Sequence, residues 1–164
     1  ARQDIGKDDI NAKITGDALR RAGVVTSQHC DLDAARAVHD LVIGLVADGI
    51  VAGVHDCSDG GLAVALAEMA FAGDTGFTVA PEPGLPVAAW CFSETASRVV
   101  LAVTPDRLDD VLGRATDGGV RAVDIGVGGG ERLVVEGAFA VPLAEARAAW
   151  SDAIPALVDA DVHV

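Results

Sequence analysis

His55-Asp56-Cys57-Ser58-Asp59-Gly60-Gly61-Leu62 is the stretch that decides the fold, because an apolar strand pattern ends there and an apolar helix pattern begins. The start of a helix offers free backbone N–H groups and a partial positive charge, which suit an anion such as phosphate. A carboxylate at the end of the strand suits Mg²⁺, a hard cation that prefers oxygen ligands. The stretch therefore predicts a corner that holds a metal-bound phosphate, with Asp56 as the metal ligand.

A purely structural explanation of the same stretch remains open. Ser58 or Asp59 would also serve as an ordinary helix cap, and the two glycines would ease a tight turn. The carboxylates of Asp56 and Asp59 favour the functional interpretation, because two such groups repel each other unless a cation or a hydrogen-bond donor lies near them.

The periodicity of apolar residues outlines the other elements. A helix is expected from Asp31, with Asp31 or Asp33 as its N-cap, to just before Gly49. Three glycines at 128–130 favour a hairpin turn over a phosphate-binding loop, because such a loop needs a helix after it. Further helices are expected near 62–70, 105–115 and 142–154, the last bent or ended near Pro155, and strands near 50–54, 76–79, 89–92, 98–103, 123–127 and 132–136.

This alternation of strands and helices predicts an α/β fold, with a mixed sheet and helices packed on it. The pattern is clear from residue 31 onward, so residues 31–164 are expected to form the domain. Residues 1–30 are charged and show little periodicity, which indicates a linker or an N-terminal arm.

The composition restricts the classes of partner. The chain of 164 residues holds 25 acidic and 12 basic residues, which argues against a nucleic-acid partner, because phosphate backbones bind basic surfaces. No apolar run approaches the roughly 18 residues of a membrane span, and the amino end is unlike a secretion signal. Cys30, Cys57 and Cys91 are widely spaced and read as reduced thiols. We therefore expect a soluble, cytoplasmic protein that does not bind membranes.

Three segments together resemble one enzyme family. Residues 55–69 are similar to the second-half signature of phosphoribosylformylglycinamidine synthase, the amidotransferase of purine biosynthesis, although Cys57 stands where an apolar or basic residue is usual. The segment Phe92-Ser93-Glu94-Thr95-Ala96-Ser97-Arg98 resembles the family's following motif, with Thr95 where serine is commoner. Residues 141–155 resemble the carboxyl end of the small bacterial and archaeal form. The resemblance covers roughly residues 31–158.

The resemblance implies a fold like the C-terminal domain of AIR synthase and a nucleotide site at the corner. It implies that Asp56 is a ligand of Mg²⁺ and that Ser58, Gly60 and Gly61 contact the nucleotide. The implied cofactor is ATP or ADP. For Glu94 and Arg98, the symmetry between the two halves of the family implies a contact with the substrate. The alternative for these two residues is a surface ion pair at i,i+4 spacing, worth at most about half a kcal/mol.

The resemblance further implies a C-terminal domain of the ATP-dependent ligase that converts formylglycinamide ribonucleotide to formylglycinamidine ribonucleotide. The expected partners are the remaining domains of the enzyme, a glutaminase subunit and a small accessory subunit. The chain would then be an incomplete and inactive fragment. Two alternatives remain, namely another ATP-using enzyme of the same superfamily, or a non-catalytic acidic interaction module of the same fold.

No catalytic residue is expected in this chain. Cys57 stands at a helix start, which can lower the pKa of a thiol, but a nucleophilic cysteine also needs its own histidine and acid. His55 at the end of a strand is typical of a packed, hydrogen-bonded residue, since acid–base catalysis needs a placed partner.

Overall fold

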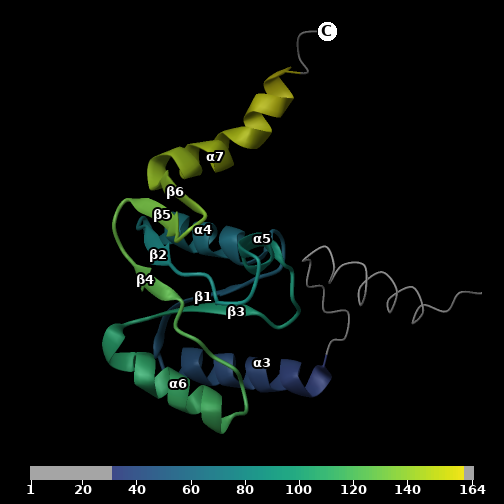
Figure 1. Ribbon diagram of the computed structural model, residues 1–164, viewed down its shortest axis with the longest axis vertical. Coiled ribbons are helices and arrows are strands. Elements are labelled where there is room, and N and C mark those ends of the chain that lie inside the picture. The colour runs from purple at the N-terminus through teal and green to yellow at the C-terminus, as the bar shows by residue number, and fades with distance from the viewer. Residues whose placement is uncertain (1–30, 161–164) are drawn as a thin grey trace, which may run out of the picture. The chain divides into compact units, whose positions relative to one another are not determined.

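The computed structural model describes residues 31–160, and their side chains through residue 155 (Figure 1). The expected arm at residues 1–30 lies outside the described residues. The described part divides into two compact units, one formed by residues 31–65 and 82–124 and the other by residues 66–81 and 125–160. One helix, α4 (Gly61–Gly73), begins in the first unit and continues in the second.

The first unit is built on a pair of antiparallel strands. The two strands pair so that Asp56, the last residue of the first strand, lies opposite Val99, the first residue of the second. The elements are α3 (Leu32–Ala47), β1 (Val51–Asp56), the start of α4, α5 (Val87–Phe92), β3 (Val99–Val103), a 3₁₀ turn (Pro105–Arg107) and α6 (Leu108–Asp117). Helices α3 and α6 lie on one side of the strand pair, and α5 lies on the other (Figure 1).

A small apolar core joins the two helices α3 and α6 to the strands. The core contains Leu45 of α3, Ile50 just before β1, and Val111 of α6. Two residues of β3 pack against it, namely Leu101 and Val103. Burial of side chains of this size stabilises by about 1.5–3 kcal/mol each, so this cluster holds β1 and β3 in place. The position of Asp56 at the end of β1 follows from this packing.

The predicted ends of α3 are confirmed. The Asp31 carboxylate accepts hydrogen bonds from the amides of Asp33 at 3.0 Å and Ala34 at 3.1 Å, as an N-cap does. Gly49 follows the helix with a φ of 66°, the left-handed conformation that commonly ends a helix.

The second unit contains the mixed sheet that the sequence predicts. The strand order is β4-β2-β5-β6, in which β2 and β5 are parallel and the other two pairs are antiparallel. The strands are β2 (Phe77–Val79), β4 (Gly126–Gly128), β5 (Arg132–Val135) and β6 (Phe139–Pro142), and α7 (Leu143–Ala160) follows. Pro155 lies inside α7 and does not end it.

Two sequence predictions are wrong in this part of the fold. The glycines at 128–130 do not close a hairpin, because β2 lies between β4 and β5. The hairpin of this unit joins β5 to β6 instead, and turns at Gly137, whose φ is 72°. The long alternating strand expected at 123–127 is reduced to the three residues of β4, all of them exposed.

Residues 89–92 were expected to be a strand but form part of α5. The run Ala-Trp-Cys-Phe is apolar, and a short apolar run does not by itself distinguish a strand from a buried helix. Pro86 precedes the helix, and its fixed φ suits a helix start. Trp90 and Cys91 supply the buried side of this short helix.

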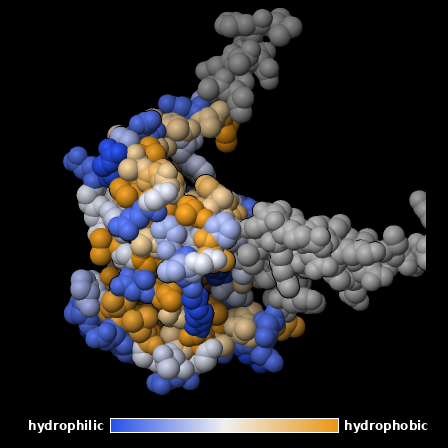
Figure 2. Space-filling model, in the orientation of Figure 1, coloured by the Kyte–Doolittle hydropathy of each residue, from blue (hydrophilic) through white to orange (hydrophobic). Residues whose placement is uncertain are grey.

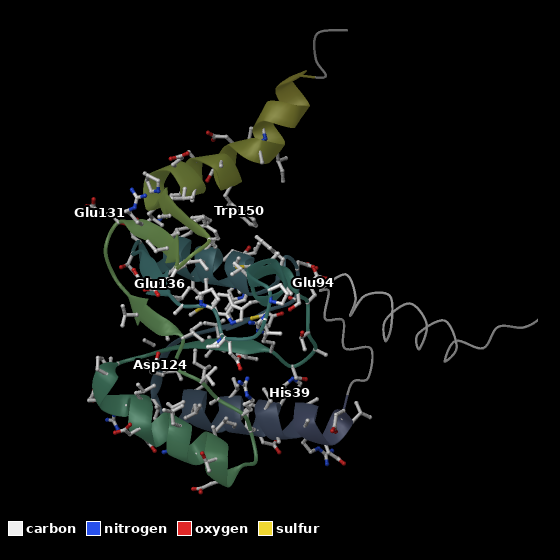
Figure 3. All side chains as sticks on the ribbon, in the orientation of Figure 1. His39, Glu94, Asp124, Glu131, Glu136 and Trp150 are labelled. Atoms are coloured by element: carbon white, nitrogen blue, oxygen red, sulfur yellow. The ribbon has the colours of Figure 1, made fainter. Side chains whose placement is uncertain are left out.

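The surface of the described part mixes apolar and charged residues. Figure 2 shows hydrophobic patches between hydrophilic ones on the face in view. Trp150 of α7 is half-exposed and lies 6.3 Å from the ring of Phe71 in α4, and both residues belong to the second unit (Figure 3). None of the helices between residues 31 and 160 is long and apolar enough to cross a bilayer.

We expect Gly76→Ala to destabilise the second unit by about 2 kcal/mol or more, since overpacking against fixed atoms is costly. A Cβ at Gly76 would lie 2.1 Å from the backbone oxygen of Arg132. Gly128→Ala is the matched control, because a Cβ there meets nothing within 4 Å. Thermal unfolding of both variants measures the difference, and equal stabilities would contradict the packing described for Gly76.

Candidate nucleotide-binding site

The candidate site lies where β1 passes through a short loop into α4. The Asp56 side chain is 68% exposed and points away from the core. Its carboxylate accepts a hydrogen bond from the Ser58 hydroxyl, and His55 Nδ1 lies 3.7 Å from Oδ1. The hydrogen bond from Ser58 lowers the pKa of Asp56 below its ordinary value, and a backbone hydrogen bond acts in the same direction. The carboxylate is therefore ionised at neutral pH and open to solvent.

The donor set at Asp56 fits one way of holding Mg²⁺. Between residues 31 and 160, no group of three or more histidine, cysteine, aspartate or glutamate side chains could enclose a metal ion. Mg²⁺ is usually held by one or two carboxylates together with phosphate oxygens and waters, rather than by a full protein cage. An exposed, ionised carboxylate at the end of a strand suits that arrangement as a single ligand.

The two glycines allow close packing at the start of α4. Gly61 has a φ of 69°, and a Cβ on it would lie 2.8 Å from the backbone carbon of Phe92 and 2.9 Å from the carbonyl oxygen of Cys91. Gly60 has a φ of 80°. The start of α4 therefore lies directly against the end of α5, and only glycine fits at position 61.

Glu94 joins the corner from the loop that follows α5 (Figure 3). The Gly60 N–H donates a hydrogen bond to Glu94 Oε1 at 3.0 Å, across 34 positions of sequence. The structure thus brings Glu94 to one of the residues expected to bind the nucleotide. Sequence reasoning missed this contact, because the pattern of residues 92–98 carries no sign of which amide the carboxylate would meet.

Arg98 is directed elsewhere. Its Nη1 donates to the carbonyl oxygen of Trp90 at 3.0 Å, and its guanidinium lies 5.9 Å from the centre of the indole ring. Its backbone reaches the corner, where the Cys57 N–H donates to the Arg98 carbonyl at 2.9 Å. Glu94 and Arg98 therefore bind different backbone groups, and the surface ion pair considered for them does not describe the arrangement.

A helix start can lower the pKa of a thiol, but at Cys57 burial acts more strongly in the opposite direction. Cys57 and Cys91 are both buried, and burial raises the pKa of each thiol because it disfavours the charged thiolate. The nearby charge of Arg98 offsets only part of that effect. Both residues are free cysteines with the properties of packed thiols rather than nucleophiles.

An open groove of about 530 Å³ borders Asp56 within the first unit. The sequence indicated the end of this groove at His55 and Asp56, but not the part of its wall that α3 supplies. On α3, Ile43 is an apolar residue that is 65% exposed, and it forms part of this wall. The lining residues are His39, Val42, Ile43, Val54, His55, Asp56 and Val99.

We expect Gly61→Ala to destabilise the chain by about 2–4 kcal/mol, because it combines a left-handed backbone with a clash against backbone atoms. Gly113→Ala in α6 is the control, since a Cβ there meets nothing within 4 Å. The control should be neutral or stabilising by about 0.5–1 kcal/mol, as expected for alanine in a helix. Chemical denaturation measures both, and a Gly61→Ala variant as stable as the control would refute this account.

We expect Ser58→Ala to raise the pKa of Asp56 toward its ordinary value, because the variant lacks the hydroxyl that stabilises the carboxylate. A depressed pKa stabilises the fold above the ordinary carboxyl pKa, and this contribution is lost as pH falls through the lowered value. A carbon-detected NMR titration of the carboxyl group measures the shift. Asp106, whose pKa is lowered by Thr104, should not respond. An unchanged Asp56 pKa in the variant would show that the hydroxyl is not the cause.

Relatives of known name match most of this chain. It is 42% identical over 135 residues to the phosphoribosylformylglycinamidine synthase subunit PurL of Sinorhizobium fredii, a match that covers 82% of this chain and 18% of that protein. It is 43% identical over 132 residues to the protein of the same name from Moorella thermoacetica, covering 78% of this chain and 18% of that protein. The chain thus spans less than a fifth of the length of these relatives.

Solved structures share the fold. The phosphoribosylformylglycinamidine synthase II of Thermotoga maritima superimposes with a TM-score of 0.65 at 21% identity, over 73% of this chain and 22% of that one. The Thermotoga maritima PurL complexed with ADP gives a TM-score of 0.65 at 20% identity, over 76% and 24%. A family model described as AIR synthase related protein, C-terminal domain, matches residues 9–137. This chain therefore belongs to the family of AIR synthase related C-terminal domains.

Proposed function

We propose that this chain is the C-terminal domain of a phosphoribosylformylglycinamidine synthase of the small type. Identities of 42% and 43% to relatives of that name support the proposal. The complete enzyme would be an ATP-dependent ligase of purine biosynthesis that converts formylglycinamide ribonucleotide to the amidine. Because the chain spans 18% of those relatives, we propose that it contributes to this reaction without completing it.

The contribution we propose is one wall of a magnesium–nucleotide site at the corner between β1 and α4. The exposed, ionised carboxylate of Asp56 supports its role as the metal ligand. Ser58, Gly60 and Gly61 would meet the phosphate chain, since they lie at the start of α4, where backbone amides suit an anion. Bound Mg²⁺ would neutralise phosphate charge beside these acidic side chains.

The observation that carries the proposal is the direction of the Asp56 carboxylate. A side chain turned inward and paired with an arginine would leave no place for an ion. Instead, the carboxylate is open to solvent and accepts a hydrogen bond from the Ser58 hydroxyl, with His55 Nδ1 3.7 Å from Oδ1. Thermotoga maritima PurL has been solved in complex with ATP and with ADP, which supports a nucleotide as the ligand class.

The segment that contains Glu94 and Arg98 is proposed to face the ribonucleotide substrate. Its support is its position, since Glu94 is bonded to Gly60 and the backbone of Arg98 to Cys57. The proposed partners are the remaining domains of the enzyme, a glutaminase subunit and a small accessory subunit, in the cytoplasm. A structure of PurLQS from Thermotoga maritima supports an assembly of this kind.

Isothermal titration with Mg-ADP tests the proposed site. We expect Asp56→Asn to weaken binding by at least about tenfold, a loss of about 1.4 kcal/mol, because the amide is a poorer magnesium ligand than the carboxylate it replaces. Asp109→Asn on the exposed side of α6 is the control and should bind as the unmodified chain does.

Equal binding by the unmodified chain and Asp56→Asn would remove the metal role from Asp56. Because the chain would supply only one wall of the pocket, the comparison of the two variants is made where the unmodified chain binds Mg-ADP.

A further inference from the structure

We propose that the Glu94 carboxylate competes with phosphate for the Gly60 N–H. It accepts the hydrogen bond from this amide in the ligand-free chain and must leave when a phosphate binds. This inference rests on the proposed nucleotide site, and it assigns to Glu94 a role in setting the affinity of that site. Glu94 is then a positioning residue for the nucleotide, in addition to any contact with the substrate.

The contact itself excludes simultaneous binding. The Gly60 N–H donates to Glu94 Oε1 at 3.0 Å, and one N–H has a single hydrogen to donate. The proposed site places Gly60 at the phosphate chain, so a phosphate oxygen there would compete for the same N–H group. The carboxylate of Glu94 therefore occupies the position of the ligand it would compete with.

The loop that carries Glu94 is anchored by other groups, so the side chain can leave without it. The Ser93 N–H donates to the Ala89 carbonyl at 3.0 Å, and the Arg98 guanidinium is held at Trp90. Ser97 has a φ of 61°, which fixes a turn that few residues adopt. Glu94 is exposed, and its flexible side chain can rotate into solvent while the loop stays in place.

The charges at the corner make displacement necessary. The exposed carboxylate of Asp56 lies at the same corner, and the only described guanidinium linked to this loop, that of Arg98, is engaged at Trp90. A phosphate that arrived while Glu94 remained would place two negative groups on one amide. A hydrogen bond to a charged acceptor is roughly twice as strong as a neutral one, so a neutral side chain at this position would be displaced more easily.

Amide hydrogen exchange tests the contact without any ligand. In Glu94→Ala, we expect the Gly60 amide to exchange at least about fivefold faster than in the unmodified chain, because a hydrogen-bonded amide must open before it exchanges. Glu145→Gln, the removal of an exposed charge in the second unit, is the control and should leave the Gly60 rate unchanged. Exchange in α6 checks that each variant is folded. Equal Gly60 rates in all variants would overturn the inference.

Titration with Mg-ADP tests the competition. Glu94→Gln should bind about three- to tenfold more tightly than the unmodified chain, because the neutral amide yields the Gly60 N–H more easily. Weaker binding by Glu94→Gln would overturn the inference about Glu94 but not the proposed nucleotide site, since Glu94 would then be a ligand rather than a competitor. If both chains bind Mg-ADP equally, the proposed nucleotide site stands and the competition fails.

Discussion

The backbone of Gly61 lies so close to the end of α5 that no side chain fits between them. A Cβ there would approach the backbone atoms of Phe92 and Cys91 to below 3.0 Å. This contact brings the loop after β1 against the loop after α5, although the two segments lie more than thirty residues apart. The hydrogen bond between Gly60 and Glu94 depends on it.

The elements that the sequence predicts correctly are those with local signals. The N-cap at Asp31 and the left-handed Gly49 define α3, and the acidic end of β1 marks the turn into α4. Residues 89–92 were misjudged because short apolar runs suit a strand and a buried helix equally well. The hairpin at 128–130 was misjudged because the glycines mark a turn, but not which strand comes to lie between β4 and β5.

In the candidate site, too, the sequence predicts local features but not contacts between distant segments. Residues close in sequence, such as Asp56 and Ser58, could be placed together from their spacing alone, and the structure shows them hydrogen-bonded. The pairing of Gly60 with Glu94 could not be predicted, because it depends on the packing of α4 against α5. The groove beside Asp56 was missed for a similar reason, since its wall combines residues of α3, β1 and β3. The roles of these residues toward a nucleotide stay predictions.

The long sequence separation between Gly60 and Glu94 has a consequence for biosynthesis. While the ribosome is still adding residues before position 94, the amide at Gly60 can be satisfied only by water. The turn into α4 therefore acquires its acceptor late, after α5 and the following loop have emerged from the exit tunnel. During translation, this corner would gain that hydrogen bond after α5 is made but before β3 and α6 complete the first unit.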